Sequence, residues 1–212
     1  MTETTLVSLA AVAGLGAFHG ANPGMGWLFA VALGMQEGRR QAVWRALLPL
    51  GAGHAVSVAA VLVAVRLLDV VSPPGWLALV AGVMLVLLGA SRLVRHRHPR
   101  WTRMRVGLAG LTAWSALMAT AHGAGLMLLP FVLSSAPAEA AGAHCHLATA
   151  GVGPGLWAVT AVHGGSYLLT TAVIAIVVYE KVGLGMLRRA WVNVDLVWAA
   201  ALVATGLLTL WR

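Results

Sequence analysis

Long apolar runs, separated by short clusters of glycine, proline and arginine, make up most of this 212-residue chain. Runs of about 20 apolar residues are long enough to cross a bilayer as one helix. The pattern predicts six spans, at about residues 5–34, 42–65, 75–93, 106–133, 155–179 and 190–210. The triplet Asn22-Pro23-Gly24 predicts a break in the first span, because proline lacks the backbone N–H that a helix requires. We therefore expect an all-α integral membrane protein with one membrane domain over residues 1–212.

Composition supports the membrane interpretation. Apolar residues make up 60% of the chain and charged residues 9%, with a mean hydropathy of +0.87. A soluble domain has about 25% charged residues. These values argue against a soluble enzyme, a disordered chain and a nucleic-acid-binding protein, despite the net charge of +8. The single cysteine, Cys145, excludes an intrachain disulfide.

The basic residues are divided unequally between the two sides of the predicted membrane domain. Twelve of the 14 Lys and Arg residues fall in loops on one side, and only Arg66 and Arg212 on the other. Because basic loops remain in the cytoplasm, both termini are predicted to lie outside, in the periplasm of a bacterial inner membrane. On the cytoplasmic side, Arg92, Arg105 and the four arginines between them are predicted to contact anionic lipid headgroups.

A pair of histidine motifs occurs twice along the chain, once in residues 1–98 and once in residues 99–212. The two copies are His19-Gly20-Ala21 with His54-Ala55-Val56-Ser57, and His122-Gly123-Ala124 with His163-Gly164-Gly165-Ser166. Each half contains three predicted spans, so the second half must enter the membrane from the opposite side. This arrangement predicts the inverted-topology repeat found in many secondary transporters.

The four repeated histidines, His19, His54, His122 and His163, are predicted to meet near the middle of the bilayer. At about 1.5 Å per residue, each lies well inside its span. Ionisable residues at this depth are costly and indicate a functional site. The alternative is that neutral histidines only bond carbonyl or serine groups of neighbouring helices. The backbone carbonyls freed at the helix break are expected to line a cavity.

Imidazole ligands suit Ni, Co, Zn, Cu or Fe, so the histidine cluster predicts a transition-metal site. Additional candidate ligands are Asn22, Met25 and Met127, and Ser57 and Ser166 are candidates for holding the imidazole tautomers. No acidic residue falls in a span beside the histidines, so a divalent cation would have only neutral ligands. In the long outer loop, His144, Cys145 and His146 predict either a point of soft-metal capture or an ordinary exposed loop.

The first 65 residues carry the order GLGAFHGANPGMGW, a basic loop and then LGAGHAVS, with His19, Pro23 and Gly53-His54 as the main features. This order resembles the nickel/cobalt transporter and related permease families of the lysine-exporter clan. The resemblance implies a three-plus-three inverted repeat and transport of a transition metal. The acidic metal-binding positions and the following histidine of those families are replaced here by Asn22, Gly24 and Met25.

The sequence therefore predicts a permease that moves a transition-metal cation by alternating access, rather than an enzyme. One alternative is a membrane redox protein in which the four histidines are axial ligands of haem. Another is a non-catalytic subunit of a membrane complex, in which the His-Gly motifs serve helix packing. The lipid bilayer is the expected partner, and both a homo-oligomer and a complex with another membrane protein are compatible with the sequence.

Overall fold

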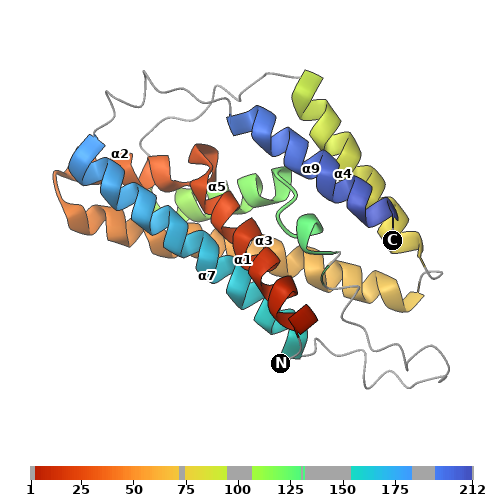
Figure 1. Cartoon of the computed structure of the whole chain (residues 1–212). Coiled ribbons are helices and arrows are strands. Elements are labelled where there is room, and N and C mark those ends of the chain that lie inside the picture. Colours follow the sequence, from red (N-terminus) through yellow and green to blue (C-terminus); the bar gives the residue numbers. More distant parts are fainter. Residues whose placement is uncertain are drawn as a thin grey trace.

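The computed structural model describes residues 3–71, 75–94, 107–129, 131, 154–182 and 194–211, and its regular structure there is entirely helical. The elements, shown in Figure 1, are α1 (Glu3–Ala21), the 3₁₀ turn η1 (Pro23–Met25), α2 (Trp27–Glu37), α3 (Arg40–Val71), α4 (Trp76–Val94), α5 (Leu108–Ala121), the 3₁₀ turn η2 (Leu126–Leu128), α7 (Pro154–Val177), the π-helical turn η4 (Val178–Val182) and α9 (Val194–Trp211). The prediction of an all-α protein is confirmed.

Two helical segments are long and apolar enough to cross a membrane, Arg40–Val65 and Trp157–Val182. They correspond to the second and fifth predicted spans. Four shorter apolar helices, Leu9–Ala21, Trp76–Arg92, Leu108–Ala121 and Leu196–Trp211, correspond to parts of the other predicted spans. These lengths are compatible with a helical membrane protein, and the division into six spans stays a prediction.

Several polar side chains are buried within the apolar core, and many large apolar side chains lie on the outside. All four repeated histidines are buried, together with Asn22 and several Ser and Thr residues. Large apolar side chains such as Leu48, Leu169 and Leu208 also lie on the outside, each exposed over 65% or more of its surface. The exposed apolar side chains agree with an apolar surrounding for the helices.

The helices associate mainly as three pairs: α1 with α7, α3 with α5, and α4 with α9. In Figure 1, α1 and α7 run side by side in the same direction. Helices α4 and α9 are antiparallel, because Gly82 contacts Gly206 while Gly89 contacts Ala199. Elements of the first half of the chain thus pack mainly against elements of the second half.

Two glycines allow α1 to approach α7 closely and α3 to approach α5 closely. A Cβ atom on Gly16 of α1 would collide with the backbone of His163, and a Cβ atom on Gly53 of α3 would collide with the backbone of Thr112. Small residues allow neighbouring membrane helices to pack backbone against backbone. Gly16 therefore brings α1 directly against the histidine-bearing turn of α7.

The chain is broken at equivalent places in the two halves. The predicted break at Asn22-Pro23-Gly24 is confirmed, because α1 ends at Ala21 and α2 begins at Trp27. In the fourth span, Gly125 and Pro130 predict a weaker counterpart of this break, and in the structure α5 ends at Ala121 and the chain turns through residues 122–125 before η2. Gly123 has φ 69°, a left-handed conformation that glycine adopts without strain. Both His19 and His122 therefore lie at the end of a helix.

Candidate histidine site

The break after α1 begins at Asn22, which caps the next turn. Its side-chain Oδ1 accepts a 2.9 Å hydrogen bond from the backbone N–H of Gly24, and Pro23 occupies the first position of η1. Proline is favoured there, because its missing N–H would have no partner at a helix start. The predicted ligand Asn22 thus uses its oxygen locally, whereas its buried Nδ2 atom has no hydrogen-bond partner among the described residues.

Three carbonyls at this break accept hydrogen bonds from side chains and so do not stay unpaired. Side chains of α2, α5 and α7 donate hydrogen bonds to them: Trp27 Nε1 to Ala21 (3.0 Å), Trp114 Nε1 to Gly24 (3.2 Å) and Tyr167 OH to Met25 (2.7 Å). A buried carbonyl without a partner costs about 1–3 kcal/mol, so these bonds are what allow the break inside the bundle.

Three of the four repeated histidines form one compact group, which we call the three-ring group: His19 of α1, His54 of α3 and His163 of α7. Their ring centroids are separated by 5.7 Å (His19–His54), 5.0 Å (His19–His163) and 5.3 Å (His54–His163). All three side chains are at most 1% exposed. The pairing of α1 with α7 and the contact of α3 with α7 bring them together.

Five nitrogens of the three-ring group have no hydrogen-bond partner among the described residues. They are Nε2 of His19 and both ring nitrogens of His54 and of His163. The Val12 carbonyl lies near the His163 ring, but without the geometry of a hydrogen bond. Buried polar atoms of proteins are normally paired, and unpaired ones call for an explanation such as an absent water or ion. The three-ring group therefore has unused capacity to bind a ligand.

The tautomer of His19 is set by the backbone of its own helix. Nδ1 of His19 lies 2.9 Å from the carbonyl oxygen of Leu15, and a carbonyl can only accept, so Nδ1 carries the proton. The lone pair is then on Nε2, the atom without a partner. His122 has the same arrangement, with Nδ1 2.8 Å from the carbonyl oxygen of Met118.

His122 contacts the other histidines through an indole rather than joining the three-ring group. The Trp198 ring of α9 lies edge to face against His19 at 4.4 Å and against His122 at 5.3 Å. Trp198 Nε1 also donates a 3.3 Å hydrogen bond to the His122 carbonyl. The four predicted histidines are therefore arranged as the three-ring group and a separate His122, and the Trp198 ring contacts both His122 and His19.

The break beside His122 is held by a cation. The guanidinium of Arg92, which is half-buried at the end of α4, donates a 3.1 Å hydrogen bond to the carbonyl of Ala121. Positive groups are stabilising at helix C-termini, where carbonyls point outward without partners. In this structure one guanidinium nitrogen of Arg92 binds the end of α5, and the expected contact of Arg92 with lipid headgroups stays a prediction. The other arginines of that predicted headgroup contact lie outside the described residues.

The predicted supporting residues have other neighbours. Ser57 shares a 2.7 Å hydrogen bond with Thr120 of α5 and does not bond His54, because the α3–α5 contact places Thr120 within its reach. Ser166 packs against Gly16 at the contact of α1 with α7. Met25 and Met127 are buried in two different apolar clusters. Ser57 thus does not hold the tautomer of His54 through a direct hydrogen bond in this structure.

Within the described part of the chain, no group of three or more His, Cys, Asp or Glu side chains is arranged to coordinate one metal ion. The rings of the three-ring group are close together, with centroids 5.0–5.7 Å apart, but they are not in an arrangement that could hold an ion. The predicted capture residues His144, Cys145 and His146 lie outside the described residues. Coordination by the three-ring group would thus need rotation of the imidazoles.

Two site residues were not predicted from the sequence, Tyr167 and Trp198. Tyr167 is fully buried and stacks on His54, with ring centroids 3.9 Å apart. It follows His163 by four residues, which places both on one face of α7. Trp198 lies inside a predicted span, whereas most of the nine tryptophans lie near span ends or in loops. The helical spacing of Tyr167 from His163 and the position of Trp198 inside a span were the sequence features that could have indicated these two residues.

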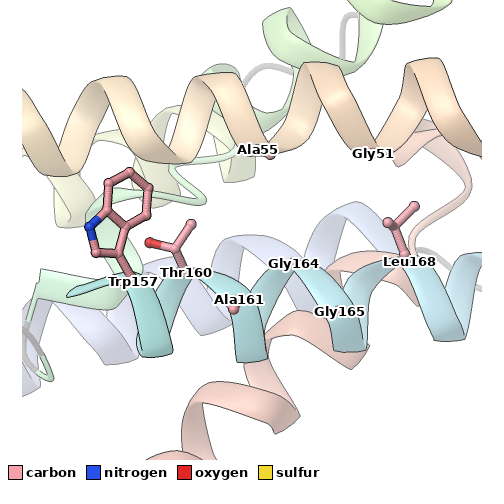
Figure 2. A pocket seen from close by; sticks show the side chains of 8 residues that line it. All are labelled: Gly51, Ala55, Trp157, Thr160, Ala161, Gly164, Gly165 and Leu168. Atoms are coloured by element: carbon pink, nitrogen blue, oxygen red, sulfur yellow. The ribbon is translucent and has the colours of Figure 1, made fainter. Parts of the chain in front are cut away.

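A hollow of about 270 Å³ lies between α3 and α7 (Figure 2). Some of the residues that line it are next in sequence to His54 and His163. It is lined by Gly51 and Ala55 of α3 and by six residues of α7 from Trp157 to Leu168. His54 precedes Ala55 and His163 precedes Gly164, but neither imidazole lines the hollow. Small side chains on both helices therefore leave space next to the histidine-bearing turns.

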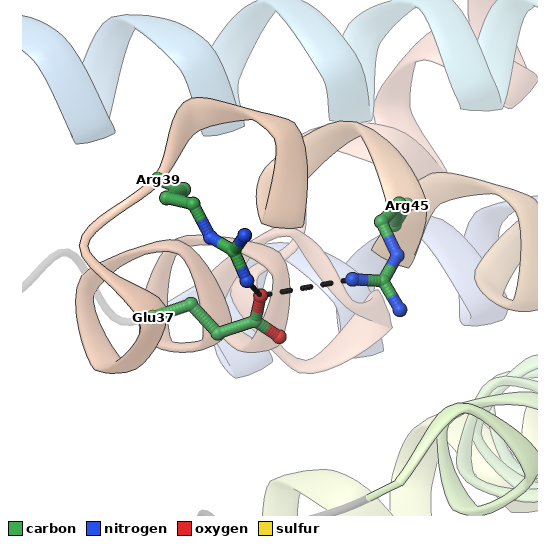
Figure 3. A network of polar contacts seen from close by, with 3 residues as sticks. All are labelled: Glu37, Arg39 and Arg45. Atoms are coloured by element: carbon green, nitrogen blue, oxygen red, sulfur yellow. Dashed lines mark hydrogen bonds and ion pairs between the residues drawn. The ribbon is translucent and has the colours of Figure 1, made fainter.

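Ion pairs gather where α2 ends and α3 begins. Glu37 lies 3.1 Å from Arg39 and 3.7 Å from Arg45, as Figure 3 shows. Arg40 pairs with Glu180 of η4 at 3.1 Å, joining the start of α3 to the turn that follows α7. The charged side chains of this group are partly exposed, so each pair contributes about 0–1 kcal/mol to stability.

Comparison of the chain with protein-family models, curated proteins and solved structures gives no match.

Proposed function

We propose that this protein is a membrane permease for a transition-metal cation, with the three-ring group as its binding site and His122 linked to that site through Trp198. The observation that carries the proposal is the set of five unpaired nitrogens on three adjacent buried imidazoles. Ionisable side chains within a membrane segment normally mark the path of a substrate or ion. Imidazole nitrogens are common ligands of transition metals.

The spacing of the rings supports a metal as cargo. A metal–nitrogen bond is about 2.0–2.1 Å long, and the ring centre lies about 1.1 Å beyond the nitrogen. Two imidazoles on one ion therefore have ring centroids roughly 5.1 Å apart in tetrahedral geometry and roughly 5.5 Å apart in trigonal geometry. The three observed separations are 5.0, 5.3 and 5.7 Å. Loading then needs rotation of the rings about their side-chain bonds. Such rotation breaks no hydrogen bond of His54 or His163 to the described residues.

An inverted repeat is supported by the pattern of helix contacts. In such a repeat α1 corresponds to α5, α3 to α7 and α4 to α9. The α1–α7 contact then corresponds to the α5–α3 contact, and the α4–α9 contact corresponds to itself. These are the three main helix contacts. The repeated His19 and His122 also have the same hydrogen bond, four residues back along their helices. In the proposed carrier, the two halves move against each other around the site, giving alternating access.

The proposed orientation follows the basic residues. Arg39, Arg40 and Arg45 gather with Glu37 and Glu180 at one end of the bundle, which we take as cytoplasmic. With six spans, both termini are then outside a bacterial inner membrane. The Arg40–Glu180 pair connects α3 of the first half to η4 of the second half, so it must separate when the halves part at the cytoplasmic end.

Haem as the alternative ligand has less support. Two histidines on opposite faces of a haem have ring centroids about 6 Å apart, because each Fe–N bond is about 2 Å long. The rings of the three-ring group are closer, and Tyr167 already covers His54. A role as a non-catalytic subunit would leave the five unpaired nitrogens without a purpose.

The proposal is tested by ion uptake into proteoliposomes that contain the purified full-length chain. A panel of Ni²⁺, Co²⁺, Zn²⁺, Cu⁺ and Ag⁺ is offered to the wild-type chain and to the combined variant His19→Gln, His54→Gln and His163→Gln. We expect at least one ion to enter and the variant to lose that uptake by at least about tenfold. Leu169→Ala, on the exposed face of α7, is the control that should transport normally. Uptake of no ion by the wild type, or equal uptake by the folded variant, would contradict the proposal.

A further inference from the structure

Among the residues whose side chains the structure describes, no carboxylate contacts the three-ring group. The carboxylates whose side chains the structure describes, Glu37 and Glu180, lie at helix ends and pair with arginines. The polar side chains described in contact with the three-ring group are the phenol of Tyr167 and the indole of Trp198. The charged group that enters the bundle near His122 is the cation Arg92. Among the described residues, a cation bound by the three-ring group would thus have no carboxylate close enough to balance its charge.

The charge of the cargo decides how unfavourable this environment is. The energy needed to move an ion from water into a medium of low dielectric rises with the square of its charge, so a divalent ion requires roughly four times as much as a monovalent ion of equal size. Neutral imidazoles replace part of the hydration shell but supply no countercharge. Buried ions without a countercharge are rare in proteins for this reason.

The number and type of ligands point in the same direction. The three-ring group offers three neutral nitrogen donors, with Nε2 of His19 available because Nδ1 bonds the Leu15 carbonyl. Zn²⁺ sites normally have four ligands, and sites for other divalent metals commonly add carboxylates or water. A soft ion with a filled d shell is satisfied by two or three nitrogen donors in an apolar pocket.

We infer that the cargo is a monovalent soft cation, Cu(I), for which Ag(I) is the chemically stable analogue. This inference rests on the proposed function and specifies its substrate. The unpaired nitrogens supply the ligands, and the rings of Tyr167 and Trp198 cover His54 and His19. Three neutral donors bind Cu(I) without a carboxylate, whereas Ni²⁺, Co²⁺ and Zn²⁺ would each keep two uncompensated charges in the bundle.

Asp195 is the acid that most directly tests this argument. It lies three residues before Trp198 on α9, and its side chain lies outside the described part of the structure. Arg188 and Arg189 precede Asp195 in the sequence, so we expect Asp195 to pair with one of them and the site to stay neutral. The variant Asp195→Asn should then transport Ag⁺ at the wild-type rate. Loss of Ag⁺ uptake in this variant, with its folding intact, would overturn the neutral-site argument.

The main experiment compares ions of different charge in one assay. The chain carries Cys145→Ser in all samples, because a thiol binds Ag⁺ and would obscure the histidine site. Proteoliposomes in a chloride-free nitrate buffer receive equal free concentrations of Ag⁺, Ni²⁺, Co²⁺ or Zn²⁺, and the metal inside is measured. Cu⁺ is tested separately with ascorbate as reductant. We expect Ag⁺ and Cu⁺ to enter at least about tenfold faster than any divalent ion, and His163→Gln to remove this advantage.

The results separate this inference from the proposed function. Uptake of Ni²⁺, Co²⁺ or Zn²⁺ that depends on His163, with slower uptake of Ag⁺, overturns the choice of a monovalent ion and leaves the permease proposal standing. If no ion enters and none raises the melting temperature of the detergent-solubilised protein, the proposed function itself fails. If Ag⁺ uptake persists in the folded His163→Gln variant, the three-ring group is not the binding site.

Discussion

The imidazole of His54 stacks on the phenol ring of Tyr167, with ring centroids 3.9 Å apart and planes 10° from parallel. The hydroxyl of the same tyrosine donates a 2.7 Å hydrogen bond to the carbonyl of Met25, in the turn that follows α1. One side chain of α7 therefore contacts both the histidine site and the helix break. Movement of the break and movement of His54 are linked through this residue.

Replacement of Tyr167 by phenylalanine separates its two contacts. Tyr167→Phe keeps the stacked ring but leaves the buried Met25 carbonyl without this donor, which should lower the free energy of unfolding by about 1–3 kcal/mol. The measurement is thermal or denaturant unfolding in detergent. Tyr179→Phe is the matched control, because that half-buried hydroxyl has no hydrogen bond to the described residues. Equal stability of the two variants would show that the bond to Met25 has no structural importance.

Two glycines of α1 should respond in opposite ways to an added methyl group. Gly16→Ala places a Cβ against the backbone of His163 and should cost about 1–3 kcal/mol, because the paired helices must separate. Gly14→Ala meets no atom within 4 Å and should stabilise the helix by about 0.5–1 kcal/mol. Melting temperatures in the same detergent compare the two. A tolerated Gly16→Ala would mean that α1 and α7 are not in backbone contact.

His122 and His163 should differ in their effect on metal binding, although both belong to the second copy of the repeated motif pair. His163→Gln removes a member of the three-ring group and should weaken Ag⁺ binding by at least about tenfold. His122→Gln should weaken it by less than about threefold, because the His122 ring contacts Trp198 instead of that group. Titration of the purified Cys145→Ser chain gives both values. Equal losses would favour the arrangement of four equivalent histidines predicted from the sequence.

The Arg40–Glu180 ion pair should contribute little to the free energy of unfolding. This small contribution should decrease when the salt concentration rises. The side chains of the pair are 56% and 36% exposed, so a double-mutant cycle with Arg40→Gln and Glu180→Gln should give a coupling energy below about 1 kcal/mol. The coupling should decrease further at 1 M salt, where the screening length is about 3 Å. A coupling above about 2 kcal/mol would mean that the pair is shielded from water by a neighbouring segment.

The helix break after α1 and the burial of the four repeated histidines were predictable from the sequence. Proline and glycine act through their own backbone, so Asn22-Pro23-Gly24 indicates a break without knowledge of its neighbours. The spacing of the histidines along apolar runs indicates depth, because a helix advances by a fixed rise per residue. The all-helical structure follows from the length and composition of the apolar runs.

The separation of His122 from the other histidines was not predictable. It depends on which residue of α9 faces the end of α5, and no local pattern specifies that Trp198 should contact both His19 and His122. The same limit applies to the bond between Ser57 and Thr120, whose positions in the chain are 63 residues apart. Periodicity gives the face of a helix that is buried, but the partner on that face is set by tertiary packing.

The five unpaired nitrogens also have a consequence for finding the cargo by screening. A ligand that pairs with these buried nitrogens stabilises the folded state, so binding should appear as resistance to heat. A ligand present at 100 times its dissociation constant stabilises the folded state by about 2.7 kcal/mol. A thermal-shift survey of ions against the wild-type chain and its His163→Gln variant can therefore rank substrates before any transport assay exists.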